Sequence, residues 1–345
     1  MRAWLRLGIL VVVASTALEL AQVPSALLFG GLLGALVYAL LAPGRLAPRP
    51  LDAPRWVSLT GQGVVGTIVG ASVDWGTFTS LGWSWPVVVA VSASTIVVSV
   101  LAGQLLRLHR GVTPVTAAFA SIAGGASGMT ALSRDLGADD RVVTVLQYLR
   151  VLVVLFSLPL VVGLVFHERG GAASGGFVLG SGRDLLYCAL AVGSGLLLGR
   201  VAHLPSPAIL GPVVTAAALH AVPGFTDAVV PTWVEGLGYL AIGVQVGLRF
   251  TLESLRSIAR MLPTAAVSIA LTMVTCAGLG LALAAATGTS RLDAYLATTP
   301  GGLYAVLATS TSTGGNVTFV TAVQLLRLLL VLLLAPALAR LLRRG

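Results

Sequence analysis

The stretch "TTPGGLYAVL", residues 298–307, places a helix-breaking run inside a strongly apolar chain. It combines two polar threonines, a proline that lacks a backbone N–H and two glycines, which are poor helix formers. An apolar run, "LLRLLLVLLLAPAL", follows at residues 325–338. The break therefore stands next to sequence that is apolar enough to enter a membrane, and the composition of the whole chain indicates whether it does.

The composition is typical of a membrane protein. Hydrophobic residues make up 57% of the chain, charged residues make up 10%, and the mean hydropathy is +0.97. Soluble proteins average about 25% charged residues. Apolar windows of roughly 20 residues, the length of a transmembrane helix, recur along the chain, whereas a membrane β-barrel would show short alternating segments. The sequence therefore predicts an all-α polytopic protein embedded in a lipid bilayer.

The basic residues are unusual because all 21 are arginines, and they give the chain a formal net charge of +9. A basic balance can indicate a nucleic-acid partner. Here the arginines are scattered among short connections, and no soluble basic domain is long enough to hold them. The positive-inside rule, by which arginines gather on the cytoplasmic side, explains the charge better. We therefore expect no nucleic-acid partner.

The apolar segments divide the chain at its midpoint. The longest polar connection, "HERGGAASGGFVLGSGRD" at 167–184, is rich in glycine and serine, which is typical of a flexible linker. We expect one membrane domain over 1–345, with repeat one at 1–166, a linker at 167–183 and repeat two at 184–345. The first segment lacks a clear signal-peptide cleavage site and is interpreted as a retained helix. The twelve predicted segments are 4–21, 24–42, 57–73, 85–106, 112–133, 142–166, 184–202, 205–221, 233–249, 262–287, 293–312 and 317–341.

The two halves share a duplicated motif. The stretch "GGASGMTALSRDLGADDRVVTVLQYLRVLVVLFSLP" (124–159) aligns without a gap with "GGLYAVLATSTSTGGNVTFVTAVQLLRLLLVLLLAP" (301–336), at an offset of 177. Upstream, "VPSALLFG" (23–30) matches "LPSPAILG" (204–211) at an offset of 181. Any two apolar segments share leucines, but shared Gly-Gly, Gln and Arg at one fixed offset indicate a duplication. The matched pairs are Gly124/Gly301, Gly125/Gly302, Gly137/Gly314, Gln147/Gln324, Arg150/Arg327 and Pro159/Pro336.

Six segments in each half leave two topologies open. If all twelve segments cross the membrane, 13 arginines fall on the cytoplasmic side and 6 on the other side. If the Gly-Gly segment of each half is re-entrant, each half has five spans, the halves are inverted, and the count becomes 16 against 3. Arg150 and Arg327 lie within the spans in the second case. The positive-inside rule therefore favours inverted repeats with both termini in the cytoplasm.

The two Gly-Gly segments then become places where the backbone leaves the helical path at membrane depth. Lipid cannot satisfy the freed N–H and C=O groups, so such a break must be buried in protein or line a wet cavity. The helix ends at a break also carry partial charges. Two breaks from inverted halves would meet near the middle of the membrane, where secondary transporters build their substrate sites.

These residues resemble the AbrB-duplication membrane family, whose members also carry the labels ammonia monooxygenase and AbrB-family regulator. The signature is Pro-Gly-Gly, then Gln-x-x-Arg about 23 residues later and an apolar run that ends in proline. The resemblance covers nearly the whole chain, although the first copy has Ala123 where the second has Pro300. More loosely, the layout is similar to the cation/proton antiporter and anion transporter superfamily. Its sodium–glutamate symporter branch has Gly-Gly re-entrant loops in two inverted halves, so this resemblance implies a transporter-like fold.

The candidate substrate site combines the two breaks with the polar side chains that follow them. Arg150 and Arg327 lie two or three turns inside apolar spans, where a charge is expensive and usually functional. Gln147 and Gln324 lie three residues earlier, on the same helix face. We expect each arginine to clamp the carbonyls freed at a break, and direct anion binding is the alternative. The predicted substrate-binding residues are Gly124, Gly125, Ser127, Thr299, Pro300, Gly301, Gly302, Gln147, Gln324, Arg150 and Arg327.

The expected function is secondary transport of a small polar or anionic solute, with the two repeats rocking against each other in alternating access. A membrane regulator or sensor without transport is the alternative, and an integral-membrane enzyme is the third. The four histidines share no metal-ligand spacing and no catalytic nucleophile is visible, so we expect neither a cofactor nor catalysis. The coupling ion, Na⁺ or H⁺, and a homo-oligomer are left open. The expected location is the plasma membrane, which is the inner membrane of a cell that has two.

Overall fold

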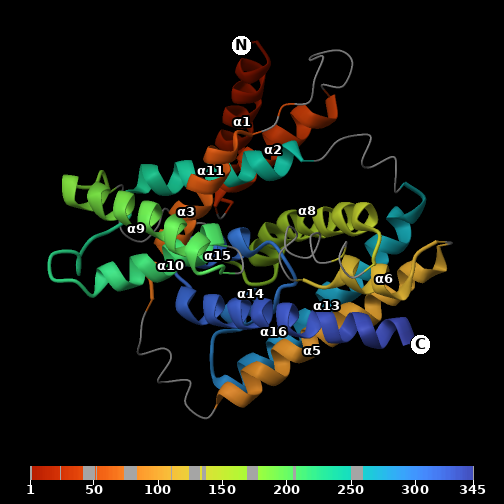
Figure 1. Ribbon diagram of the computed structural model, residues 1–345. Coiled ribbons are helices and arrows are strands. Elements are labelled where there is room, and N and C mark those ends of the chain that lie inside the picture. The colour runs from red at the N-terminus through yellow and green to blue at the C-terminus, as the bar shows by residue number, and fades with distance from the viewer. Residues whose placement is uncertain are drawn as a thin grey trace. The chain divides into compact units, whose positions relative to one another are not determined.

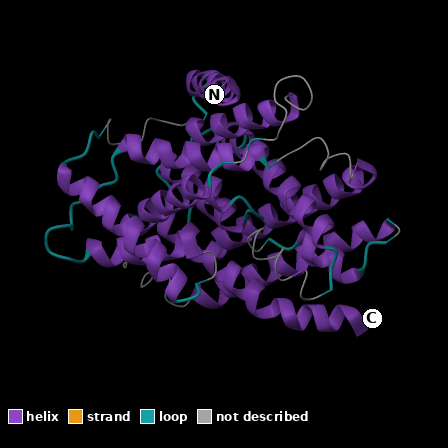
Figure 2. Ribbon diagram, turned by 45° about the horizontal axis from the view of Figure 1, so that its top comes forward, coloured by secondary structure: helices purple, strands orange, loops and turns teal. Residues whose placement is uncertain are grey.

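The computed structural model describes residues 2–23, 25–41, 51, 53–73, 84–109, 111–123, 133, 137–168, 178–204, 207–249 and 259–344. Within these ranges all regular structure is helical and no strand is present (Figure 2). The predicted all-α class is therefore confirmed. Three predicted site residues, Gly124, Gly125 and Ser127, lie outside the described residues.

Six helices in the described ranges are long and apolar enough to cross a membrane. Two shorter apolar helices, Ala26–Leu41 and Pro207–His220, accompany them. The apolar faces are extensive, and leucines and valines are exposed along their length, as lipid-facing side chains would be. The six are Ala3–Leu20, Trp85–Leu108, Val142–Leu164, Gly182–Val201, Ala259–Thr287 and Val317–Ala335.

The chain folds into two compact units, and neither unit is a single half of the sequence. Unit 1 comprises Met1–Asp74, Val162–Glu253 and Leu307–Thr318, and unit 2 comprises the remaining segments. Unit 1 holds α1 (Arg2–Leu20), α2 (Ala26–Leu41), α3 (Arg55–Ala71), α9 (Gly182–Val201), α10 (Pro207–His220) and α11 (Thr232–Leu248). Unit 2 holds α5 (Trp85–Gly103), η2 (Gln104–Leu108), α6 (Pro114–Ser121), η3 (Ala259–Met261), α13 (Leu262–Thr287), α14 (Arg291–Thr298) and most of both α8 (Asp140–Leu164) and α16 (Val317–Arg344). The short helix α15 (Leu303–Ser312) has residues in both.

Local sequence signals explain where several helices begin. Proline stands in the first turn of α5, α6 and α13, where its missing N–H costs nothing. Thr113 caps α6, Ser290 caps α14, and Ser181 forms a capping box with Asp184 at the start of α9. These caps satisfy backbone N–H groups that would otherwise have no partner.

Glycines let the helices of unit 1 approach closely. A Cβ added at Gly243 on α11 would collide with the backbone of Leu28 on α2, and one added at Gly66 on α3 would collide with the backbone of Ile209 on α10. Figure 1 shows α2 beside α11 and α3 beside α10. Membrane helices commonly associate through such small residues because the backbones can then pack against each other.

The two helix pairs are matched by the duplication. Gly66 and Gly243 differ by the offset of 177, and Leu28 and Ile209 differ by the offset of 181. One turn further along, Gly70 faces Val213 and Gly247 faces Leu32. Because the contacts advance together along both helices of each pair, α2 runs parallel to α11 and α3 runs parallel to α10.

In unit 2, glycines likewise allow close packing around α6 and α14, its two shortest α-helices. A Cβ at Gly103 on α5 would collide with Ser121 and Ala117 on α6, and a Cβ at Gly280 on α13 would collide with Thr298 and Ala294 on α14. All three members of each set are again related by the offset of 177. The short helices α6 and α14 are thereby held against α5 and α13, with seven of the eight α6 residues buried.

Candidate functional site

The helical path is interrupted at the predicted place in the second repeat. Helix α14 ends at Thr298 and α15 begins at Leu303, so the four residues between them are outside both helices. Gly301 has a φ of 120° and Gly302 a φ of 68°. A residue with a Cβ rarely adopts these angles, so the two glycines are required by the backbone geometry of the break. Pro300 is buried at this break.

The carbonyls freed by this break are bonded by two side chains of α16. Gln324 Nε2 donates to the carbonyl oxygens of Leu296 (2.8 Å) and Thr299 (3.2 Å). Arg327 Nη1 donates to those of Thr299 (2.8 Å) and Thr298 (3.3 Å). Arg327 Nη2 donates to Gln324 Oε1, which fixes the two side chains together. The end of α14 therefore has the partners that lipid cannot supply.

Helix α8 makes the equivalent bonds in the first repeat. Gln147 Nε2 donates to the carbonyl oxygens of Phe119 (2.6 Å) and Ile122 (2.8 Å). Arg150 Nη1 donates to that of Ser121 (2.6 Å), and its Nη2 donates to Gln147 Oε1 (2.6 Å). Each of these donors and acceptors is 177 positions before its counterpart in the second repeat. The duplication therefore extends to individual hydrogen bonds.

The proline of the second break is not needed for its helix to end. Thr299, which precedes Pro300, has φ −54° and ψ 126°, the extended backbone that a following proline favours. Ile122, which precedes Ala123, has φ −69° and ψ 129°. The two helices end in the same conformation, so the Gln–Arg pair and the burial of the helix end are sufficient in the first repeat.

The two Gln–Arg pairs are deeply buried. The relative exposure is 0% for Gln147, 3% for Arg150, 2% for Gln324 and 5% for Arg327. Every hydrogen-bond partner described for the two guanidinium groups is a neutral oxygen. Both groups lie at the second break, where Arg327 bonds the carbonyl of Thr299 and a Cβ added at Gly301 would be 3.2 Å from Arg150 Nε. Unit 2 therefore contains two buried cations whose described partners carry no negative charge, which is energetically costly.

Each guanidinium group has one nitrogen atom without a described partner. The Nε atoms of Arg150 and Arg327 are buried and have no hydrogen-bond partner in the described structure. Arg150 Nε lies beside the second break, because a Cβ added at Gly301 would be 3.2 Å from it. The arginine of the first repeat therefore faces Gly301 of the second.

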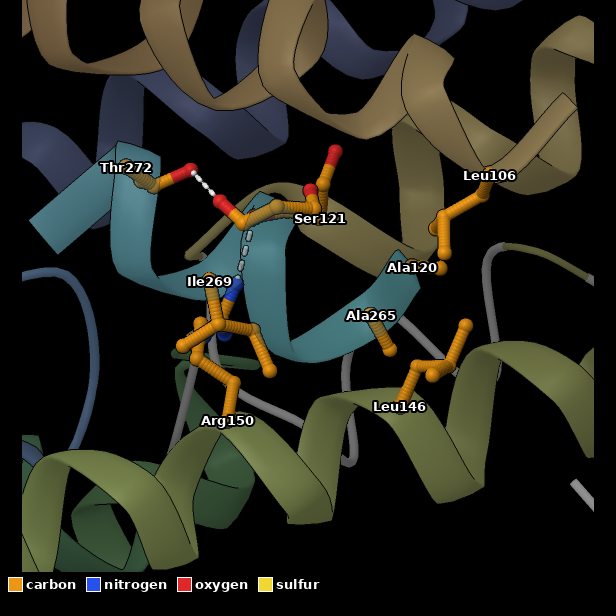
Figure 3. A pocket seen from close by; sticks show the side chains of 9 residues that line it. Leu106, Ala120, Ser121, Leu146, Arg150, Ala265, Ile269 and Thr272 are labelled. Atoms are coloured by element: carbon orange, nitrogen blue, oxygen red, sulfur yellow. Dashed lines mark hydrogen bonds between the residues drawn. The ribbon is translucent and has the colours of Figure 1, made fainter. Parts of the chain in front are cut away.

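A small cavity of about 10 Å³ adjoins Arg150. Figure 3 shows Arg150 reaching from α8 toward Ser121, with Thr272 on α13 nearby. A space of this size corresponds to about one water molecule. The polar residues at its wall can hydrogen-bond such a water, and the remaining lining is apolar. The lining residues are Leu106, Ala120, Ser121, Leu146, Arg150, Ala265, Ser268, Ile269 and Thr272.

The structure brings together seven of the predicted site residues in unit 2: Gln147, Arg150, Thr299, Gly301, Gly302, Gln324 and Arg327. The sequence did not show which backbone carbonyls accept hydrogen bonds from the Gln–Arg pairs. A carbonyl carries no residue-type signal, and only its fixed spacing before the Gln–Arg pair could have identified it. Among the described residues, no group of three or more His, Cys, Asp or Glu side chains is placed to hold a metal ion.

A second and larger cavity, of about 290 Å³, lies in unit 1. Its walls include the last turns of α3 and α10 and the first turn of α11. His220, Asp227 and Glu235 give it a polar lining, and the His220 ring packs edge-on against Tyr187. The sequence did not single out this cavity, because its residues come from segments far apart in the chain.

The chain is similar to a known protein family and to two named proteins over most of its length. The family model described as "Transition state regulatory protein AbrB" matches residues 27–343. A protein of Escherichia coli K12 that carries the name AbrB, and is described as a candidate regulator, is 32% identical over 98% of this chain and 95% of its own length. The protein YhjN of Bacillus subtilis 168 is 24% identical over 91% of this chain and 86% of its own length. The chain therefore belongs to the AbrB family of membrane proteins.

Proposed function

We propose that the protein is a secondary transporter that moves a small polar or anionic solute across the membrane by alternating access. The observation that carries this proposal is the matched pair of buried Gln–Arg clamps, each of which holds the end of a helix that stops inside the apolar unit. Secondary transporters bind solutes at interrupted helices because these are the places where backbone groups can face a ligand at membrane depth.

Helix directions in unit 1 support inverted repeats. If all twelve predicted segments crossed the membrane, α2 and α11 would run in opposite directions, and so would α3 and α10. If one segment per half is re-entrant, both pairs run in the same direction. The glycine contacts of Gly243 and Gly247 with α2, and of Gly66 and Gly70 with α10, are those of parallel pairs. They therefore favour five spans and one re-entrant segment in each half.

The second cavity supports the same topology. It joins the end of α3, at Ser72, to the end of α10, at His220, and to the start of α11, at Glu235. These three helix ends lie on one side of the membrane only if the halves are inverted. In the arrangement with twelve spans, Ser72 would lie on the opposite side from the other two.

Chain lengths around the second break support a re-entrant segment. The hydrogen bonds from Gln324 and Arg327 place the end of α14 about 10–15 Å along α16 from its start at Val317. Helix α15 has ten residues, or about 15 Å, and only residues 313–316 separate its end from α16. These lengths favour a path in which α15 returns to the level at which α16 begins.

Movement that preserves the described packing would carry helices of both repeats together, since each compact unit draws helices from both. The rocking motion is therefore proposed for mixed sets of helices and not for one intact repeat against the other. Coupling to Na⁺ or H⁺, a homo-oligomeric assembly and a plasma-membrane location with cytoplasmic termini belong to the same proposal.

A regulatory role without transport is the second candidate, and the description of the Escherichia coli relative as a candidate regulator favours it. Reconstitution separates the two. Purified protein in proteoliposomes is expected to show saturable uptake of at least one labelled small acid or polar metabolite, and the Gly301→Leu variant is expected to show none. If a broad panel of acids, amines and sugars gives no protein-dependent uptake, the regulator becomes the better description.

A further inference from the structure

The two clamp arginines leave unit 2 with positive charge that its described residues do not balance. Arg150 and Arg327 are at least 95% buried, and their described hydrogen-bond partners are carbonyl and amide oxygens. A clamp for carbonyls does not need a charge, because a neutral amide such as the Gln324 side chain already performs that task. Two charges kept in an apolar interior are usually paired or functional.

The Nε–H donors that have no described partner indicate a ligand. In each guanidinium group both Nη atoms donate to clamp oxygens, whereas Nε is buried without a partner in the described structure. An unpaired buried donor costs about 1–3 kcal/mol when its hydration is lost. An acceptor that carries negative charge would satisfy the donor and balance the cation at the same time.

The space beside Arg150 Nε exists because residue 301 is a glycine. A Cβ at Gly301 would be 3.2 Å from Arg150 Nε, so any side chain at this position would cover the free donor. The cavity of about 10 Å³ is lined by Arg150 but not by Gly301, and it has room for one water or for one small group of a ligand. These dimensions favour a compact ligand group over a large one.

We infer that the solute is a small carboxylate, which accepts hydrogen bonds from the free Nε–H donors of Arg150 and Arg327 beside the Gly301–Gly302 break. The inference rests on the proposed function, because it names the class of solute that the transporter carries. Carboxylate oxygens suit planar guanidinium donors, and two cations allow either a monocarboxylate or a small dicarboxylate. The anion would be bound while the Nη atoms keep both helix ends in place.

Binding can be measured without transport. The purified full chain is titrated with sodium acetate and sodium oxalate, and its melting temperature is recorded at constant ionic strength kept by a bulky sulfonate salt. Acetamide, which has the shape of acetate without its charge, is the matched neutral probe. We expect at least one of the two carboxylates to raise the melting temperature in a saturable way, and acetamide to have no such effect.

Variants locate the binding site. Arg150→Gln and Arg327→Gln are each expected to weaken carboxylate binding by about tenfold to a hundredfold, the range for losing a hydrogen bond to a charged group. Arg340→Gln, which removes an exposed arginine of the same helix α16, is expected to leave the affinity unchanged. Each titration is referred to the melting temperature of the same variant without ligand.

A glycine variant covers the case in which an arginine variant does not fold. Gly301→Ala keeps both charges but places a methyl group against Arg150 Nε, so it is expected to weaken carboxylate binding by at least tenfold. Gly314→Ala is the control, since Gly314 also has a positive φ, of 68°, but nothing lies within 4 Å of an added Cβ. Its affinity for the carboxylate is expected to match that of the unaltered protein.

The outcomes separate this inference from the proposed function. Carboxylate binding that requires both arginines, without any uptake in proteoliposomes, would support the anion site and refute transport. Uptake of neutral or cationic solutes, together with no carboxylate binding, would support transport and overturn the anion site. Equal stabilisation by acetate and acetamide, or unchanged binding in both arginine variants, would also overturn it.

Discussion

Replacing Arg327 with glutamine is the most informative single perturbation of the Gln–Arg clamp. The change removes the Nη1 donor from the carbonyls of Thr298 and Thr299, and the Nη2 donor from Gln324. Glutamine is too short to restore these bonds from the same position. Thr299 keeps a bond from Gln324 at 3.2 Å, whereas Thr298 loses its described side-chain donor.

The expected loss follows from these groups. One buried acceptor left without a partner costs about 1–3 kcal/mol, and the buried charge that disappears with Arg327 offsets part of any further loss. For a compact unit of this size, 1 kcal/mol corresponds to a change of about 2–4 °C in the melting temperature. We therefore expect Arg327→Gln to lower the Tm of the ligand-free protein by roughly 2–12 °C.

The assay is thermal unfolding of the purified protein without solute, followed by intrinsic tryptophan fluorescence. Arg150→Gln is expected to cause a smaller loss, because Arg150 holds one described carbonyl and Arg327 holds two. Arg340→Gln is the surface control and should leave Tm unchanged. If Arg327→Gln has the Tm of the unaltered protein but no longer responds to the solute, the clamp reasoning is refuted and Arg327 is solely a ligand.

Three further predictions test other parts of the structure. Gly301→Leu and Gly125→Leu should abolish uptake while membrane insertion persists, because Gly301 has a positive φ that a side chain would strain and Gly125 belongs to the matching Gly-Gly pair of the first repeat; full uptake by both variants would show that these glycines serve only in packing. Gly243→Val should lower Tm, because its side chain would meet the α2 backbone at Leu28, whereas Gly278→Val on α13, with open space around it, should not. Gln324→Leu should lower Tm because the carbonyl of Leu296 loses its described side-chain donor, whereas that of Thr299 keeps its bond from Arg327; Gln324→Glu, which keeps acceptors but loses the donors, should not restore it.

Much of the candidate site could be predicted from sequence because its signals are residue types that are out of place in an apolar span. The Thr299–Gly302 interruption was predictable from proline and glycine, and the Gln–Arg pairs from their polarity and fixed offset. The backbone oxygens of Phe119, Ser121 and Leu296 were not predictable, because a carbonyl has no residue type. The sequence also did not show that α6 would end although Ala123 stands where the second repeat has Pro300. The helix ends there because its last turn is buried and hydrogen-bonded, without a proline.

The two compact units could not be predicted from the sequence either. The duplication predicts two halves that are contiguous in the chain, but α1–α3 pack with α9–α11, and the remaining helices of both halves form the other unit. The packing of helices from different halves depends on which helix faces carry small residues. Gly66 and Gly243 mark these faces only once their partners on α10 and α2 are known.

The inverted arrangement is tested most directly by measuring on which side of the membrane two loops lie. In a background where the buried Cys188 and Cys276 are replaced by alanine, single cysteines are introduced at Gly224 and at Ala259, both of which are exposed. A membrane-impermeant maleimide added to intact cells should label the cysteine at 224 and should reach the cysteine at 259 only after the membrane is opened. Twelve spanning segments require the reverse pattern, and that pattern would contradict inverted repeats and the re-entrant breaks on which the transport site depends.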